Sequence, residues 1–329
     1  MSTLLSTNRN CHRRAGFTLI EMTIVIAIIA ILTAMAMSVY ATAAQQARGM
    51  RTRSIIAKID QLIGEKYESY RTRQAPIRIN PGTTPQNAAA LRLLAIHELM
   101  RFEMPDRITD VTAGPTYVGP SGVIIPSASL YPSMSLAVLP TRPALNKQYL
   151  RRAAANANGI ENWSSPNENA ECLYLILATM RDGEKSALDY FSPTEIGDVD
   201  DDGMNEILDS WGQPIAFLRW APGYRADIAP FPVTSQTMED PDPFDPFKVD
   251  PRWTNGSALT PFALRPLIWS AGPDKRHDIN VGGGFIYATT LPANDPYVNT
   301  GAIGTPTDTN GDSSLDYGDN ITNHDLEAR

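Results

Sequence analysis

Cysteine and histidine, the residue types that bind zinc, are scarce in this 329-residue chain. Its two cysteines, Cys11 and Cys172, are too few for a scaffold held together by disulfides. Its four histidines are scattered, and no H-E-x-x-H or C-x-x-C spacing occurs, so zinc chemistry has little support. No G-x-S-x-G nucleophile motif is present, and no Lys-Ser/Thr pair follows the glycines at 282–284, which excludes a phosphate loop there. Together these absences argue against an enzyme.

Positive charge is also in deficit. The net charge of −8 argues against a nucleic-acid partner, because proteins that bind nucleic acids present a basic face. The deficit is uneven along the chain: residues 1–80 carry a balance of +7, and residues 81–329 carry −15. This asymmetry predicts that the two ends of the chain work in different environments.

No charged residue occurs between Met22 and Ala41. At ~1.5 Å per residue, this run of 20 residues is long enough to cross a bilayer as a helix. A buried core helix is rarely apolar all round at this length, and a secretory signal has a shorter apolar region followed by a small-residue cleavage site. We therefore predict a membrane helix. Its amino-terminal flank, with Arg9, Arg13 and Arg14, is expected in the cytoplasm by the positive-inside rule.

The border of this run carries a second signal. Gly16 separates the basic segment from the apolar one, and Glu21 is a lone carboxylate just inside the apolar run. A charge in that position is costly unless it finds a partner, so Glu21 is a functional candidate. The stretch R-R-A-G-F-T-L-I-E, which ends at Glu21, resembles the class III leader of type IV prepilins and type II secretion pseudopilins.

The resemblance implies a processing reaction and a contact between subunits. A membrane prepilin peptidase would cut between Gly16 and Phe17 and methylate the new terminal amine of Phe17. Glu21 would then pair with the Phe17 amine of a neighbouring subunit in a filament. Such a pair satisfies a buried carboxylate and a buried ammonium together, and it also sets the register between subunits.

The same resemblance implies an α+β, pilin-like fold, in which a long N-terminal helix packs on a small antiparallel sheet, here with an enlarged, loop-rich head. The predicted segments are a removed leader (1–16), a transmembrane or filament-core helix (17–41), an amphipathic continuation (42–75) and an exported globular head (76–329).

Several elements are predicted from local patterns. Apolar residues between Ile55 and Tyr70 recur at three- and four-residue intervals, which predicts one buried face of a helix that ends by Pro76. Further helices are expected at 88–103 and 170–180, the second capped by the polar residues at 167–169 and containing Cys172 as a packed, inert thiol. The acidic, proline-rich segment 239–251 predicts a surface loop.

Two turns resemble the carboxy-terminal sheet of the major type II pseudopilin. Asp209–Pro214 matches a D-x-W-G-x-P turn that enters a strand, and Ser270–Asp274 matches an S-x-G-P-D turn that leaves one. In that family a nearby loop binds calcium. The resemblance therefore implies Asp274 and Asp278 as candidate ligands here.

Two other acidic runs are spaced like calcium loops. Asp198–Gly203 has the order D-x-D-x-D-G, in which alternate carboxylates and a turn glycine can wrap oxygens around a hard cation. Its candidate ligands are Asp198, Asp200, Asp202, Glu206 and Asp209. The second run looks like a dockerin-type loop, although Ser313 replaces the turn glycine; its candidates are Asp308, Asn310, Asp312, Asp316 and Asp319. The alternative for each run is an acidic, solvated turn.

The leading functional prediction is a structural subunit, not an enzyme, of a type II secretion pseudopilus or a type IV pilus-like filament. Its expected partners are prepilin peptidase, copies of itself and other pilin-like subunits, an inner-membrane assembly platform and membrane lipid. It is expected to cross the inner membrane once, with the leader cytoplasmic and the head periplasmic. The alternative is an uncleaved single-pass anchor that displays a calcium-dependent adhesive or binding domain. A membrane-tethered hydrolase that uses His277 and Asp278 is least favoured, since such neighbours are more often a polar turn.

Overall fold

The computed structural model describes residues 17–77, 79, 81–114, 141–156, 158–164, 166–228, 236–254, 260–282, 295–297, 303–308 and 316–326. The chain divides into two compact units, Met1–Ala47 and Arg48–Arg329. We call the second one the C-terminal unit.

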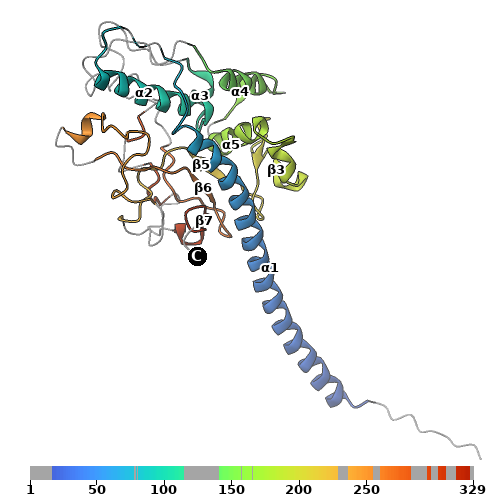
Figure 1. Ribbon diagram of the computed structural model, residues 1–329. Coiled ribbons are helices and arrows are strands. Elements are labelled where there is room, and N and C mark those ends of the chain that lie inside the picture. The colour runs from blue at the N-terminus through green and yellow to red at the C-terminus, as the bar shows by residue number, and fades with distance from the viewer. Residues whose placement is uncertain are drawn as a thin grey trace, which may run out of the picture. The chain divides into compact units, whose positions relative to one another are not determined.

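The first helix, α1, spans Leu19–Ser69 (Figure 1). Its predicted apolar face is confirmed. The buried apolar side chains of its second half are Ile55, Ile56, Ile59, Leu62, Ile63 and Tyr67, and Tyr70 directly after the helix is buried too. The helix ends at Ser69, ahead of Pro76.

The described residues that follow form four shorter α-helices: α2 (Pro85–Glu103), α3 (Ile108–Thr112), α4 (Ala144–Ala154) and α5 (Glu168–Thr179). The helices predicted at 88–103 and 170–180 are therefore confirmed as α2 and α5. Thr84 caps α2 by accepting a hydrogen bond from the Asn87 amide, and Pro85 suits the first turn because that turn needs no amide donor. Asn167 precedes α5, but its side chain makes no capping hydrogen bond, contrary to expectation.

The strands are short and all their pairings are antiparallel. β1 (Arg181–Asp182) pairs with β2 (Lys185–Ser186), and β3 (Ile196–Gly197) pairs with β4 (Glu206–Ile207). A three-stranded sheet has the order β5 (Ala216–Leu218), β6 (Leu267–Ser270) and β7 (Ile321–Thr322). Short 3₁₀ turns complete the elements: η2 (Ile160–Asn162), η3 (Ala187–Tyr190), η4 (Pro193–Glu195), η5 (Pro251–Trp253) and η6 (Asp316–Asp319).

A long N-terminal helix with small antiparallel sheets is the α+β layout expected of a pilin-like fold. The strands predicted beside the two turns are present as β5 and β6, in register through the Phe217–Ile268 pair. These two side chains belong to one hydrophobic cluster with the buried face of α1, so helix and sheet share a core. α5 also packs on β5 (Figure 1).

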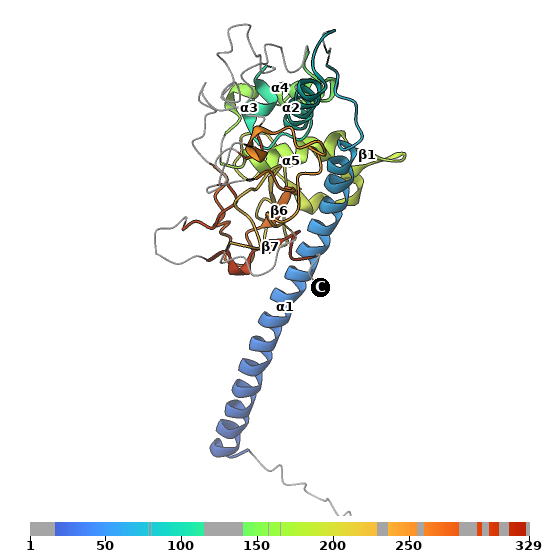
Figure 2. The ribbon, with the colours of Figure 1, turned by 60° about the vertical axis from the view of Figure 1, so that its left-hand side comes forward.

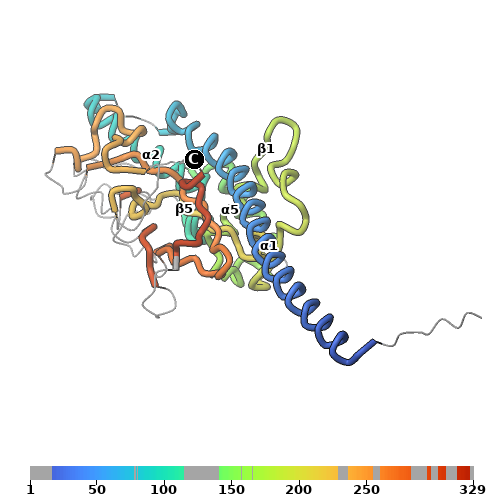
Figure 3. Tube along the Cα trace, turned by 90° about the horizontal axis from the view of Figure 1, so that it is seen from below, coloured from blue at the N-terminus to red at the C-terminus, as the bar shows by residue number. Residues whose placement is uncertain are grey.

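Two features mark the edges of the C-terminal unit. The β1–β2 hairpin projects from the unit (Figure 2). The C-terminal end of the chain returns to α1 (Figure 3), where the Asn323 amide donates a hydrogen bond of 2.7 Å to the Asp60 carboxylate. The two chain segments of this unit that are farthest apart in sequence are thereby joined.

The segment 239–250 is free of helix and strand and partly exposed, as a surface loop should be, but the prediction that it stays out of the core is wrong. Phe244 is buried, and its ring meets the Tyr67 ring of α1 edge-on at 5.2 Å. Asp245 is also buried, because its carboxylate accepts hydrogen bonds from the amides of Val249 and Asp250 and from the Trp253 indole. Local hydrogen bonds thus allow an acidic segment to enter the core.

A buried histidine predicts how the stability of this core depends on pH. His97 is 4% exposed, and its ring meets that of Trp220 edge-on at 5.8 Å. Burial, together with Arg252 and Arg219, lowers the pKa of His97 to about 3. The unfolded chain therefore binds one more proton than the folded chain between pH ~6.5 and pH ~3, so folding free energy is lost across this window as the pH falls.

The effect of His97 is expected to reach a few kcal/mol at the acidic end of the window. The test is urea unfolding at pH 7, 5 and 4 for the wild type and for His97→Phe, which keeps an aromatic ring beside Trp220. The variant should lose less stability on acidification than the wild type. Equal losses would contradict the prediction.

Candidate functional site

The N-terminal segment begins in the structure at Phe17, which is 77% exposed, while Gly16 lies outside the described residues. Thr18 and Glu21 form a reciprocal cap at the start of α1. The Thr18 amide donates to Glu21 Oε2 at 2.8 Å, and the Glu21 amide donates to Thr18 Oγ1 at 3.2 Å. Glu21 is therefore held at the amino end of the helix, where a carboxylate also interacts well with the helix dipole.

The apolar run that follows Glu21 has no packing partner within its own unit. The helix qualifies as a membrane span by length and composition, with a mean hydropathy of 2.5 over its most apolar window and none of that window buried. Large apolar side chains such as Ile24, Ile28 and Leu32 are all about half exposed or more. So much exposed apolar surface is typical of a helix that lipid or other apolar helices cover.

A second candidate site lies in the C-terminal unit, at the loop between β3 and β4. Two overlapping groups of side chains there have ligand atoms within 4.8 Å of one another: Asp198, Asp200 and Glu206 form one, and Glu171, Asp200 and Asp202 form the other. We call these five residues the acidic cluster. The structure thus brings together four of the five acids predicted for the first calcium loop and adds Glu171 from α5.

Four members of the acidic cluster have one carboxylate oxygen held by a donor. The Gly203 amide donates to Asp198, and the Val199 amide donates to Glu206. Ser164 and Asn167 donate side-chain hydrogen bonds to Asp200, and the Trp163 indole donates to Glu171. The other oxygen of each is buried and has no hydrogen-bond partner among the described residues: Asp198 Oδ1, Asp200 Oδ1, Glu206 Oε1 and Glu171 Oε1.

Burial raises two pKa values in this cluster. The pKa of Glu171 is about 9, and nearby Asp202, Glu206 and Asp200 add to the effect of burial. The pKa of Glu206 is raised to about 8 by burial, with contributions from Asp200, Asp198 and Asp202. Crowded, desolvated carboxylates hold protons in this way unless positive charge reaches them.

Sequence spacing alone could not identify Glu171, since it precedes the loop by a whole helix. The nearby sequence offers one indication of its position: Trp163, whose indole can donate a hydrogen bond, lies eight residues before the Glu171 carboxylate, which is in the first turn of α5. Asn167, expected to cap α5, donates instead to Asp200 and so orients a member of the cluster.

Asp209, the fifth acid predicted for this loop, lies outside both groups of the described acidic cluster. Its Oδ1 accepts the amides of Trp211 and Gln213, and its Oδ2 accepts the hydroxyl of Ser270 at 2.6 Å. Asp209 therefore shapes the D-x-W-G-x-P turn and ties it to the end of β6. The hydrogen bond between Ser270 and Asp209 thus joins the two turns that were predicted from separate motifs.

The acids implied by the family resemblance take other positions. Asp274 Oδ1 accepts the Arg276 amide, and the Asp274 amide donates to Asp319 Oδ2 at 3.3 Å. Asp278 is 1% exposed and has a positive φ of 42°. Asp319, predicted for the second calcium loop, thus lies beside the S-x-G-P-D turn. Within the described parts of the chain, neither Asp274 nor Asp278 belongs to a group with metal-ligand geometry.

The second predicted calcium loop is largely outside the described residues. Asn310 and Asp312 are not among them, and of Asp316 only the backbone, in η6, is described. Asp308 is described just after the Ile279–Pro306 bridge. Calcium binding by this loop stays a prediction.

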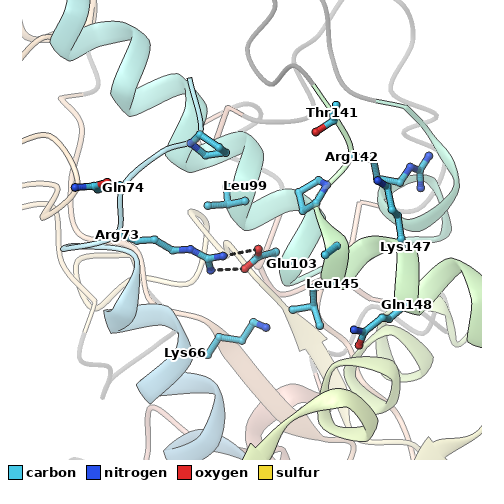
Figure 4. Close-up of a pocket in the computed structure, with 13 residues that line it drawn as sticks. Lys66, Arg73, Gln74, Leu99, Glu103, Thr141, Arg142, Leu145, Lys147 and Gln148 are labelled. Atoms are coloured by element: carbon cyan, nitrogen blue, oxygen red, sulfur yellow. Dashed lines mark hydrogen bonds and ion pairs between the residues drawn. The ribbon is translucent and has the colours of Figure 1, made fainter. Parts of the chain in front are cut away.

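A pocket of about 720 Å³ opens among residues of α1, α2 and α4 and the chain before α4 (Figure 4). Arg73 and Glu103 form a two-pronged ion pair there, with N–O distances of 2.5 and 2.8 Å. Arg142 donates to the carbonyls of Thr112 and Ala113, and burial lowers the pKa of Lys66 to about 8. The two arginines at this pocket therefore hold chain segments together.

Two reactive side chains considered in the sequence are in packed surroundings. Cys172 is fully buried in α5, and burial raises the pKa of its thiol, which makes it a poor nucleophile. His277 meets the Trp269 ring edge-on at 5.9 Å, and burial lowers its pKa. Both placements agree with packing roles.

Comparison with known proteins identifies the N-terminal segment. Residues 11–37 match the family model of the prokaryotic N-terminal methylation motif. No curated protein and no solved structure matches the chain. The match and the apolar helix indicate a membrane-anchored protein that crosses the membrane once. The match does not extend to the turns at 209–214 and 270–274, so their resemblance stays a prediction.

Proposed function

We propose that this chain, a type IV pilin-like protein by its N-terminal methylation motif, is a structural subunit of a type II secretion pseudopilus or of a type IV pilus-like filament. Prepilin peptidase cleaves it after Gly16 and methylates Phe17, and the subunits polymerise through the N-terminal helix. The single observation that carries the proposal is the motif match at residues 11–37, which is followed by an apolar helix with no partner in its own unit.

The physical argument starts from the exposed apolar helix. In the membrane, lipid covers the side chains between Met22 and Ala41. In a filament, the same surface is covered by the equivalent helices of other subunits, so a subunit can leave the bilayer without exposing apolar surface to water. The apolar run thus serves both as the anchor and as the filament core.

The charges at the start of the helix set how the subunits join. Cleavage after Gly16 removes the basic leader and leaves a new amine on Phe17, four residues before Glu21. A Glu21 carboxylate in an apolar surrounding needs a cation, and the amine of a neighbouring Phe17 supplies one. Joining subunits through this charge pair is a structural role, and it requires no catalytic group.

The location follows from the leader and the head. The leader carries three arginines and no acid, which favours retention in the cytoplasm, whereas the acidic C-terminal part is exported. We propose the inner membrane, with the head in the periplasm, where it meets other pilin-like subunits and an assembly platform. Membrane lipid surrounds the helix until assembly.

Mass spectrometry of the mature amino terminus tests the proposal. We expect a chain that starts at N-methylated Phe17 and lacks the first 16 residues. Gly16→Val is the matched control, because a β-branched side chain at the cleavage position prevents the close backbone approach that glycine allows, so the variant should keep its leader. An intact leader in the wild-type chain would instead support the alternative of an uncleaved anchor.

A further inference from the structure

The acidic cluster combines two segments of the C-terminal unit. The first, residues 163–171, supplies Glu171 from α5 and the donors Trp163, Ser164 and Asn167 that precede the helix. The second, residues 198–206, supplies three aspartates from the loop between β3 and β4 and Glu206 from the start of β4. Side chains from two separate segments thus converge on one place, while a solvated acidic turn would use its own loop alone.

The unsatisfied oxygens are the observation that points to a ligand. Glu171 and Glu206 are both 0% exposed, and within the part of the chain that the structure describes each has a buried Oε1 without a hydrogen-bond partner. Their Oε2 atoms are held by Trp163 and Val199, which orients both carboxylates. Leaving a buried carboxylate oxygen unpaired is costly, so oriented oxygens of this kind indicate a site for a group that is electron-poor.

The donors around the cluster do not neutralise it. Every hydrogen bond to the four oriented carboxylates comes from a neutral amide, hydroxyl or indole. Among the ion pairs of the described residues, none includes a member of the cluster. A cation is therefore the kind of ligand that completes this arrangement.

We propose that Glu171, Asp198, Asp200, Asp202 and Glu206 bind a calcium ion that joins α5 to the loop between β3 and β4. The site is independent of the proposed filament function, because its residues all lie in the C-terminal unit and do not require cleavage at Gly16.

The chemistry of the donors selects the metal. All five side chains offer carboxylate oxygens, which are hard ligands, and no thiol or imidazole takes part, which disfavours zinc. Calcium accepts six to eight oxygens in a flexible geometry, which suits two overlapping groups that share Asp200. Magnesium requires near-octahedral ligands and dehydrates reluctantly, so it fits this arrangement less well.

The loop backbone is built for close packing around the cluster. Gly203 has a φ of +93°, and a Cβ atom there would displace the Asn156 side chain. Asn156 in turn donates a hydrogen bond of 3.2 Å to the Asp202 carbonyl. Glycine therefore suits the backbone conformation and leaves this hydrogen bond undisturbed.

Calcium binding is expected to stabilise the C-terminal unit. The loop leads directly into β4, and α5 packs on both β4 and β5, so a cation between α5 and the loop ties the β3–β4 pair to the helix that also covers β5. A ligand that binds only the folded state raises the melting temperature by mass action. At calcium a hundredfold above Kd, we expect a rise of about 4 °C or more.

The test uses the full chain in detergent, stripped with a chelator and titrated with calcium chloride by isothermal calorimetry, with thermal melts in parallel. Glu171→Gln keeps the size of the side chain and can still accept the Trp163 hydrogen bond. We expect it to weaken calcium binding by about tenfold or more, as loss of one charged ligand does. Asp200→Asn, which alters the residue shared by both groups, should do the same and serves if the first variant fails to fold.

Asp201→Asn is the matched control in the same loop. Asp201 is exposed, lies outside both groups and has a positive φ of 58°, a conformation that asparagine tolerates. This variant should bind calcium as the wild type does. Absence of heat and of a melting shift in the wild type would overturn the proposal, as would wild-type binding by both Glu171→Gln and Asp200→Asn. Because neither readout involves the amino terminus, failure here leaves the proposed processing untouched.

Discussion

A Glu21→Gln variant is expected to be cleaved and membrane-inserted normally but to be excluded from filaments. Glutamine can still accept the hydrogen bond from the Thr18 amide, so the cap at the start of α1 is kept. Only the negative charge is lost. Removing one partner of a buried ion pair costs about 3–5 kcal/mol, which corresponds to a loss of about a hundredfold or more at each subunit contact. Filament yield after shearing or crosslinking measures the effect.

The matched control for Glu21→Gln is Glu65→Gln, the same chemical change on an exposed part of the same helix. It should assemble as the wild type does. Mass spectrometry of both variants shows whether processing is intact, which separates a defect in assembly from a defect in cleavage. Wild-type filament yield from Glu21→Gln would refute the pairing of Glu21 with a neighbouring Phe17 amine.

An Asp110→Asn variant is expected to destabilise the C-terminal unit by about 3–5 kcal/mol, the range for breaking a buried ion pair. Asp110 is 0% exposed and pairs with two buried arginines: its Oδ2 is 2.9 Å from Arg219 Nη1, and its Oδ1 is 3.4 Å from Arg101 Nη1. Burial acts to raise the pKa of Asp110, but Arg219 and Arg101 outweigh it, and the net shift is downward. The folded state thus depends on the Asp110 charge.

The consequences of this loss extend across the unit. Arg219 directly follows β5, and it also donates to the Met104 carbonyl after α2. Its pair with Asp110 of α3 therefore connects the three-stranded sheet to the helices α2 and α3. In the Asp110→Asn variant, the buried guanidinium groups of Arg219 and Arg101 each lose a carboxylate partner. Urea unfolding of the full chain, followed by tryptophan fluorescence, measures the cost, since all five tryptophans lie within the C-terminal unit.

Glu184→Gln provides the control for Asp110→Asn. Glu184 is exposed between β1 and β2, so its replacement should change the free energy of unfolding by no more than about 0.5 kcal/mol. If Asp110→Asn unfolded at the same urea concentration as Glu184→Gln, the buried network would not stabilise the unit as argued.

Local sequence patterns predicted those structural features that depend only on residues close together in the chain. Composition predicted the apolar run after Glu21, and periodicity predicted the buried face of α1 and the helices α2 and α5. In a helix, the spacing of apolar residues along one segment decides which face of that segment is apolar. The alternation of carboxylates from Asp198 to Glu206 likewise predicted that the four acids of this segment lie close together.

Contacts between distant segments could not be read in this way. Glu171 joins the acidic cluster only because α5 packs beside β4, and Asn167 serves Asp200 there and not its own helix. Asp209 fits the loop spacing but is drawn into a turn, because Ser270 at the end of β6 donates to it. The segment 239–251 is polar in composition, yet Phe244 finds Tyr67 of α1.

The sequence by itself determined that the chain is anchored and pilin-like, because a charge-free run and a short motif act through solvation and local chemistry, which need no fold. Only the tertiary structure decided which acids face one another and which arginines are buried with Asp110. Arg101 and Arg219 lie 9 and 109 residues from Asp110 in the sequence, and whether a charge is paired, unpaired or solvated is set by the packing that brings the segments together.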